Sequence, residues 1–206
     1  FGSIDRESNY LVRSTTERRG TVLLLRDTEA LRRDLDAKTR QSTRFAVIVM
    51  HPEQKVAAHE HFGTPLVFSI QEAKGLEYEN IILYNFTSAD RERFDAITSG
   101  VSAADIAGAE LTYGRARDKG DKSLEIYKFH INALYVAVTR AVANVYLVEE
   151  APEQALFELL GLKIVEGKVD IEAQRSSLEE WRAEARRLEL QGKQEQADEI
   201  RSRILQ

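Results

Sequence analysis

Apolar residues along the chain gather in short runs that alternate with polar, helix-forming stretches. The runs that predict buried strands are Thr21–Leu25, Phe45–Met50, Leu66–Ile70, Asn80–Asn85 and Val145–Val148, with Lys163–Val165 as a last edge strand. Asp27-Thr28-Glu29 starts a helix that runs to about Thr39, and Pro52 suits the first turn of another, which ends near Gly63. Strands that alternate with helices of about ten residues favour βαβ crossovers. The pattern therefore predicts an α/β fold with a mostly parallel sheet flanked by helices.

Residues 87–130 interrupt this alternation. They are charged, contain four glycines, and are typical of helices with loops, so we interpret them as a helical insertion. Phe129–Val142 follows as a helix with Leu134, Val138 and Ala141 on one face, and Pro152–Leu160 is a short helix.

The end of the chain differs in character. Ser177–Leu190 and Gln194–Leu205 each carry an apolar stripe at helical spacing, and Gly192 separates them, which predicts a helical hairpin. The order of residues in the hairpin is similar to a single tetratricopeptide-type repeat. With a boundary near Gly167–Gln174, the chain divides into a leading segment (1–20), an α/β domain (21–166) and the hairpin (175–206). We expect the α/β domain to remain folded without residues 175–206.

The composition is that of a globular protein, with 43% apolar and 31% charged residues among 206. The chain has no cysteine, no signal-peptide pattern and no apolar run that approaches the roughly 20 residues of a membrane span. We therefore expect a cytoplasmic protein with no membrane partner. The chain begins Phe-Gly-Ser, and its only methionine is Met50, which indicates a fragment of a longer protein.

The net charge of −5 is unevenly placed. Residues 143–206 hold 14 acidic and 9 basic side chains, which leaves 20 of each in residues 1–142. A protein that binds nucleic acid on its own usually has a basic surplus, so strong autonomous binding is not expected. His59 and His61, two apart, point to different faces of a helix and are better interpreted as solvated surface residues than as metal ligands. We therefore predict no metal site.

Two stretches carry candidate chemistry. In Lys74-Gly75-Leu76-Glu77, glycine permits close approach of the backbone to a ligand, and the carboxylate of Glu77 can accept hydrogen bonds from a ribose. The alternative is that Gly75 shapes a turn and Glu77 is solvated. Arg140 ends an apolar helical stretch, and its guanidinium suits the charge that develops on a transferred phosphoryl group. Its alternative is an ordinary ion pair.

The two stretches together resemble a known family. Ser69-Ile70-Gln71-Glu72-Ala73-Lys74-Gly75-Leu76-Glu77-Tyr78 is similar to motif V, and Leu134-Tyr135-Val136-Ala137-Val138-Thr139-Arg140-Ala141 to motif VI, of the UvrD/Rep-type superfamily 1 helicases. The resemblance covers roughly residues 20–150 and implies the second RecA-like domain of such a helicase, a fold of the P-loop NTPase type. It departs from the family at Gln71, where histidine is usual, and at His51, where many relatives have an arginine.

The resemblance also implies roles. Gly75 and Glu77 would contact the ribose of ATP, and Arg140 would reach the γ-phosphate as an arginine finger. Ser69 and Gln71 would face single-stranded nucleic acid, and Lys74 would support either contact.

The sequence has no Gly-x-x-x-x-Gly-Lys-[Ser/Thr] loop. We also expect no strand end with paired acids that holds Mg²⁺. The implied partner is therefore the first RecA-like domain of the parent protein, which would hold ATP and Mg²⁺, and the chain alone is predicted to be inactive. The alternative is a degenerate RecA-like scaffold without ATPase activity that binds a protein through its acidic helical tail. A third alternative, a free-standing nucleotide-binding enzyme of flavodoxin-like shape, has no phosphate-cradling loop in the sequence to support it.

Overall fold

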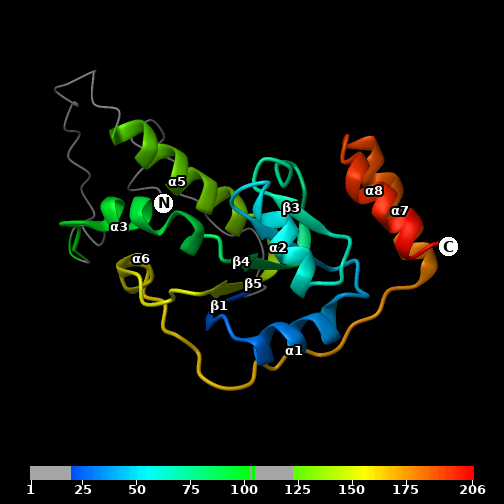
Figure 1. The fold of residues 1–206 in the computed structure, drawn as a ribbon, viewed down its shortest axis with the longest axis horizontal. Helices are drawn as coiled ribbons and strands as arrows, with labels where there is room; N and C mark the ends of the chain where they lie inside the picture. Colours follow the sequence, from blue (N-terminus) through cyan, green and yellow to red (C-terminus); the bar gives the residue numbers. More distant parts are fainter. Residues whose placement is uncertain (1–19, 103, 105–122) are drawn as a thin grey trace.

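A single parallel sheet forms the centre of the molecule (Figure 1). The computed structural model describes residues 20–102, 104 and 123–206. Within them the strands are β1 (Thr21–Arg26), β2 (Phe45–Val49), β3 (Val67–Ser69), β4 (Tyr78–Tyr84) and β5 (Ala141–Glu149). They lie in the order β1-β5-β4-β2-β3, and every neighbouring pair is parallel. The α/β prediction is confirmed, and the arrangement is consistent with a RecA-like domain.

Helices cover both faces of this sheet. They are α1 (Glu29–Thr39), α2 (Gln54–His61), the 3₁₀ turn η1 (Ser88–Asp90), α3 (Arg91–Thr98), α5 (Ser123–Val138), α6 (Ala155–Leu159), α7 (Leu178–Leu190) and α8 (Gln194–Arg203). The predicted start of α1 is correct, since the side chain of Thr28 accepts a hydrogen bond from the backbone N–H of Leu31 at 3.2 Å.

Alternation along the strands divides the core into two layers. In β2, Ala46 and Ile48 face one layer, while Phe45, Val47 and Val49 face the other. The first layer also receives apolar side chains from α3, α5, α6, α7 and α8. The second lies under α1 and the end of α2. Because both faces are covered, the strands are near-continuous apolar runs, which is why they are recognisable in the sequence.

The connector from α6 to α7 is extended and follows the sheet and α1 (Figure 1). The predicted edge strand at 163–165 is reduced to one bridge, between Ile164 and Leu24. Farther on, Val169 and Ile171 are buried in the second layer, and the backbone N–H of Gln174 donates to the carbonyl of Lys38 at 2.9 Å. The connector thus carries the chain around the sheet to the hairpin.

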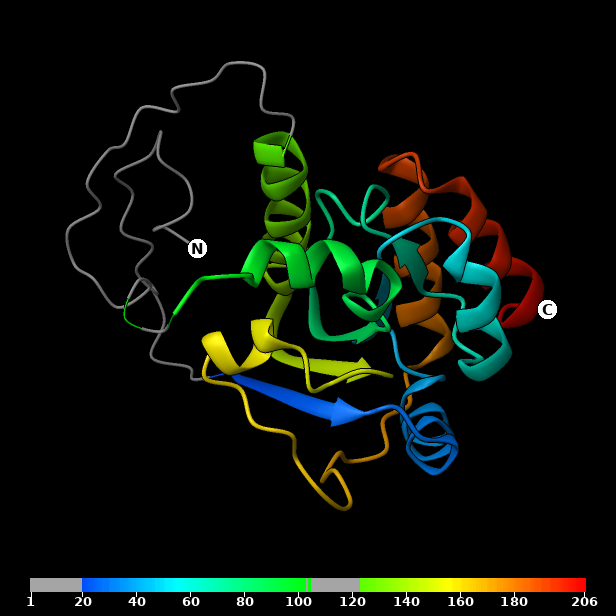
Figure 2. The ribbon, with the colours of Figure 1, turned by 60° about the vertical axis from the view of Figure 1, so that its left-hand side comes forward.

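The predicted helical hairpin is present, and it packs against the sheet (Figure 2). Trp181, Leu188 and Ile200 are buried in the same apolar cluster as the first face of the sheet. Gly192, at φ +73°, provides the left-handed residue that ends α7. This shared core argues against the expectation that the α/β domain remains folded when residues 175–206 are removed.

Two predictions fall partly outside the described residues. Of the predicted leading segment, only Gly20 belongs to the described residues. Within the predicted insertion at 87–130, the structure has η1, α3 and the first part of α5, while residues 103 and 105–122 lie outside the described residues. Across the described ranges, no helix is long and apolar enough to cross a membrane.

Candidate functional site

The two motif-like stretches meet at the amino-terminal edge of the sheet. Glu77 directly precedes β4, and Arg140 directly precedes β5, which is its neighbour in the sheet. The backbone N–H of Tyr78 donates to the carbonyl of Arg140 at 2.9 Å. Because the strands are parallel, residues that precede them share one edge. Residues more than sixty positions apart are therefore adjacent here.

Arg140 joins the end of α5 to the loop before Glu77. Its Nε donates to the carbonyl of Val136 at 3.0 Å, and its Nη1 to the carbonyl of Leu76 at 3.0 Å. Its Nη2 donates to the hydroxyl of Thr139 at 3.3 Å. Among the described residues no carboxylate forms an ion pair with this half-buried guanidinium, and these bonds use three of its five N–H groups. Arg140 is thus fixed in place while two N–H groups remain for another acceptor.

The loop from Lys74 to Glu77 presents its polar residues to solvent. Ala73 and Leu76 are buried in the first core layer, whereas Lys74, Gly75 and Glu77 are exposed. Gly75 has φ +81°, a conformation that a side chain makes unfavourable. The buried pair anchors the loop, so the three candidate nucleotide contacts lie on its outer side.

The two candidate nucleic-acid contacts lie at the opposite, carboxyl-terminal end of β3. Ser69 is only 1% exposed, and its backbone N–H and hydroxyl both donate to Glu72 Oε2, at 2.7 and 2.9 Å. Gln71 is exposed. The structure thus brings Glu77, Gly75, Lys74 and Arg140 together and separates them from Ser69 and Gln71. Of the two candidate nucleic-acid contacts, Gln71 is exposed and Ser69 is buried.

Sequence reasoning missed a charge cluster beside Ser69. Lys55 Nζ lies 3.0 Å from Glu72 Oε1 and 2.8 Å from both carboxylate oxygens of Glu195. Burial alone would lower the pKa of Lys55, but the hydrogen bonds with Glu195 and Glu72 raise it above its ordinary value. Burial alone would raise the pKa of Glu72, but hydrogen bonds from Ser69 and Lys55 lower it. Since 140 positions separate Lys55 from Glu195, no local signal could have found this pair.

A second missed cluster surrounds Tyr78. Its hydroxyl donates to Glu184 Oε1 at 2.6 Å, and Arg187 holds the same carboxylate through Nε at 2.9 Å and Nη2 at 2.7 Å. The guanidinium carbon of Arg187 lies 4.8 Å from the centre of the Tyr78 ring. Burial raises the pKa of Tyr78 well above 10.0. The spacing of Glu184 and Arg187 on one helix predicts their pairing, but not their contact with Tyr78.

The carboxyl-terminal edge of the sheet, where open α/β folds usually bind ligands, is occupied by internal hydrogen bonds. Glu149 is fully buried and accepts hydrogen bonds from the backbone N–H groups of Thr87 and Ser88, at 3.0 and 2.9 Å. Burial raises the pKa of Glu149. The amino-terminal edge is therefore the better candidate for a nucleotide contact.

The histidines follow no metal-binding pattern. His51 and His130 both contact Asp90 Oδ2, at 2.7 and 3.0 Å from Nε2. His59 lies 3.8 Å from Glu199 on α8, and burial lowers its pKa. His61 packs edge-on against Tyr84. In the residues that the structure describes, no three or more His, Cys, Asp or Glu side chains are grouped to hold a metal ion.

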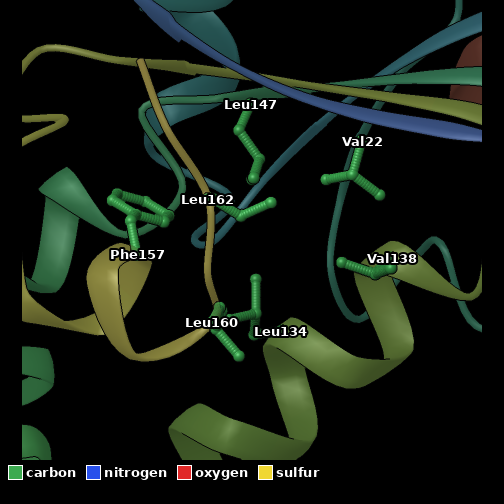
Figure 3. Close-up of a pocket in the computed structure, with 7 residues that line it drawn as sticks. All are labelled: Val22, Leu134, Val138, Leu147, Phe157, Leu160 and Leu162. Carbon is green, nitrogen blue, oxygen red and sulfur yellow. The ribbon is translucent and has the colours of Figure 1, made fainter. Parts of the chain in front are cut away.

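An apolar groove of about 150 Å³ opens between β1, α5 and α6 (Figure 3). Its lining is Val22, Leu134, Val138, Leu147, Phe157, Leu160 and Leu162. A lining without charged or polar side chains cannot satisfy a phosphate or a ribose. The groove is therefore separate from the candidate nucleotide contacts.

Fold and site together define an α/β domain whose candidate chemistry lies on the amino-terminal edge of a parallel sheet. No family model matches the chain, and no solved structure matches it. The human protein named "TPR and ankyrin repeat-containing protein 1" is 28% identical to it over 123 residues. The similarity covers 52% of this chain, which spans only 4% of the length of that relative.

Proposed function

We propose that this chain is the C-terminal motor domain of an ATP-dependent superfamily 1 helicase or translocase that acts on DNA or RNA in the cytoplasm. One observation carries the proposal: the loop with Glu77 and the guanidinium of Arg140 are joined at an exposed edge of the sheet, through the contact between Arg140 Nη1 and the carbonyl of Leu76. Glu77 and Arg140 would have to be neighbours in this way if both contacted the same nucleotide.

In this function, ATP and Mg²⁺ are held mainly by the first RecA-like domain of the parent protein. The residues of this chain fit the remaining parts of the nucleotide. The exposed carboxylate of Glu77 accepts hydrogen bonds from the ribose, and Gly75 leaves room for it beside the backbone. Lys74 adds a positive charge nearby. The two remaining N–H groups of Arg140 stabilise charge on the γ-phosphate when the domains close.

Single-stranded nucleic acid is the second proposed partner. It would reach the carboxyl-terminal end of β3, where Gln71 offers an exposed amide. Ser69 would act there indirectly, through Glu72, because its hydroxyl and its backbone N–H both already donate to that carboxylate.

The experiment that tests this function is Arg140→Ala in the full-length parent. We expect ATP turnover to fall about a thousandfold or more, the range for loss of an arginine finger, with ATP binding largely retained. Arg33→Ala on α1 is the matched control, because Arg33 is an exposed arginine whose ion pair, among the described residues, is with Glu29 of its own helix. Unchanged turnover in Arg140→Ala would remove the finger assignment.

The second candidate function is a scaffold without ATPase activity. The observation that favours it is that Arg140 already donates to three groups of its own chain, as a purely structural arginine would. Arg140→Lys separates the two. Lysine keeps a positive charge but cannot make the same set of bonds. A motor therefore loses turnover in this variant, whereas a scaffold has no turnover to lose, and only its melting temperature falls.

A further inference from the structure

The C-terminal hairpin contacts both ends of the segment 69–78, which carries all the motif V residues. Helix α7 contacts its last residues, and α8 reaches its first ones through Lys55 of α2. Figure 2 shows the hairpin beside α2 on this side of the sheet. The middle of the segment is anchored by Ala73 and Leu76, which are buried in the first core layer. The hairpin therefore adds contacts at the two ends where the candidate site residues lie.

At the nucleotide end, the contacts form a closed cluster. Tyr78 donates to Glu184, and Glu184 is held by a two-point bond from Arg187. Arg187 Nη1 also lies 3.3 Å from the carbonyl of Glu77, so one guanidinium contacts the backbone of the proposed ribose-binding residue. A planar guanidinium held at several points by other groups has little freedom to move. It thereby restricts the position of the Glu77 backbone.

At the nucleic-acid end, the hairpin acts through Lys55. This buried ammonium joins Glu195 of α8 to Glu72, whose other oxygen accepts two hydrogen bonds from Ser69. Gln196, the next residue of α8, donates to the carbonyl of Val67 in β3 at 3.1 Å. A shift of α8 would therefore leave Lys55 facing only one carboxylate and would loosen the start of the segment.

We propose that the C-terminal hairpin is the positioning element of the candidate site, with Arg187 setting the nucleotide end of the segment 69–78 and Glu195 its nucleic-acid end. This inference rests on the proposed function. Because both contacts come from one rigid hairpin, whose core residues Trp181, Leu188 and Ile200 pack on the sheet, any partner that displaced it would loosen both ends together.

The first test compares Arg187→Met with Arg186→Met. Arg186 is an exposed neighbour on the same helix and is the matched control. In the 206-residue chain, we expect Arg187→Met to accelerate amide hydrogen exchange at residues 75–78. In the full-length parent, we expect it to raise the KM for ATP about tenfold, as for the loss of one charge-assisted hydrogen bond, with a smaller effect on kcat. Arg186→Met should change neither.

The second test compares Glu195→Ala with Asp198→Ala. In the described part of the chain, Asp198 contacts Arg201 and Gln194 of its own helix, and it is the matched control. We expect Glu195→Ala to accelerate amide exchange at residues 69–73. In the parent, it should reduce the stimulation of ATPase activity by single-stranded nucleic acid severalfold while the KM for ATP stays unchanged. If the hairpin only stabilised the fold, a change in α7 and a change in α8 would not affect the KM for ATP and the stimulation by nucleic acid separately.

Failure of this inference differs from failure of the proposed function. Unchanged exchange in both variants would overturn the positioning role, whatever the activity of the parent. Faster exchange with unchanged KM and unchanged stimulation would also overturn it, provided that Glu77→Gln in the same parent impairs ATP use. If Glu77→Gln leaves ATP use intact, the proposed function is wrong, and the positioning of a nucleotide site by the hairpin is wrong with it.

Discussion

Tyr78 shows at the level of one residue how the candidate site is coupled to the hairpin. Its backbone N–H bonds to the carbonyl of Arg140, while its hydroxyl bonds to Glu184 of α7. Its ring lies 5.9 Å from that of Phe68, between centres, within the first core layer. A single residue, through its backbone and its side chain, thus joins the motif VI turn, the sheet and the C-terminal hairpin.

The raised pKa of Tyr78 makes its contribution to stability depend on pH. Burial first, and then the neighbouring Glu184, place the folded-state pKa well above the unfolded value of 10.0. The contribution is therefore fully present below pH 10.0 and is lost as the pH rises through the folded-state value. Tyr84, whose pKa is raised to about 12 by burial, acts in the same direction.

We predict that Tyr78→Phe lowers the free energy of unfolding at neutral pH and flattens its decline above pH 10.0. The loss at neutral pH follows because the buried carboxylate of Glu184 keeps only Arg187 as a partner, a cost of about 1–3 kcal/mol. Urea unfolding at a series of pH values, followed by the emission of Trp181, measures both effects. An equally steep alkaline decline in Tyr78→Phe would contradict the assignment.

At the level of elements, the hairpin behaves as a layer of the domain. Its sole tryptophan, Trp181, is 2% exposed, and Leu188 and Ile200 are fully buried in the cluster that also contains Tyr78 and Phe68. The start of α7 is fixed by a capping box, in which Ser177 and Glu180 satisfy each other's backbone N–H groups. Such a layer should unfold with the sheet.

Leu188→Ala is therefore expected to destabilise the whole chain. Removing a fully buried leucine side chain costs about 2–5 kcal/mol. Leu190, two positions along the same helix, is 83% exposed, and Leu190→Ala should change stability by less than about 0.5 kcal/mol. Trp181 emission and far-ultraviolet circular dichroism should report one coincident transition. Two separate transitions would mean that the hairpin is an independent unit.

The strands were predictable because each contains a short apolar run, most of which is buried within the covered sheet. The weak points were the ends of elements. The predicted helix 129–142 overran into the strand, because Ala141 pairs with Tyr78 in the sheet and α5 ends at Val138. The predicted strand 163–165 is a single bridge, because its pairing with β1 is confined to Leu24, which pairs with Ile164 and accepts a hydrogen bond from the backbone N–H of Val165. Boundaries depend on pairing with distant residues, which local patterns do not contain.

The candidate site, like the fold, could be predicted only in part from the sequence. Glu77 and Arg140, which the family resemblance assigns to one nucleotide, lie side by side at one edge of the sheet. The burial of Ser69 could not be predicted, because it depends on Glu72 turning back onto Ser69 and on Lys55 from another helix. The docking of the hairpin was equally hidden, since an amphipathic stripe shows that a helix has a buried face but not what covers it.

At the scale of the whole molecule, several charged side chains of the hairpin form ion pairs within the chain. Glu195 faces Lys55, Glu184 faces Arg187, and Glu189 pairs with Arg201. Two of these three pairs use arginines of residues 143–206 and leave the acidic surplus of that part unchanged, whereas Lys55 comes from outside it. A scaffold that binds through an acidic tail therefore keeps most of its charge argument.

The last prediction concerns the isolated 206-residue chain. Positioning and neutralising the phosphates is most of phosphoryl-transfer catalysis, and the sequence contains no phosphate-binding loop. Strand β5 does end in paired acids, Glu149 and Glu150, but Glu149 is fully buried and already accepts hydrogen bonds from the backbone N–H groups of Thr87 and Ser88. Glu77 and Arg140 contribute only a ribose contact and a finger in the proposed function. We therefore expect ATP hydrolysis by the chain alone to equal the blank, in a phosphate-release assay with and without single-stranded DNA.

Adding the first RecA-like domain of the parent should restore turnover, and Arg140→Ala should abolish that gain. Robust hydrolysis by the isolated chain would show that it contains a complete site, and the division of the nucleotide between two domains would then be wrong.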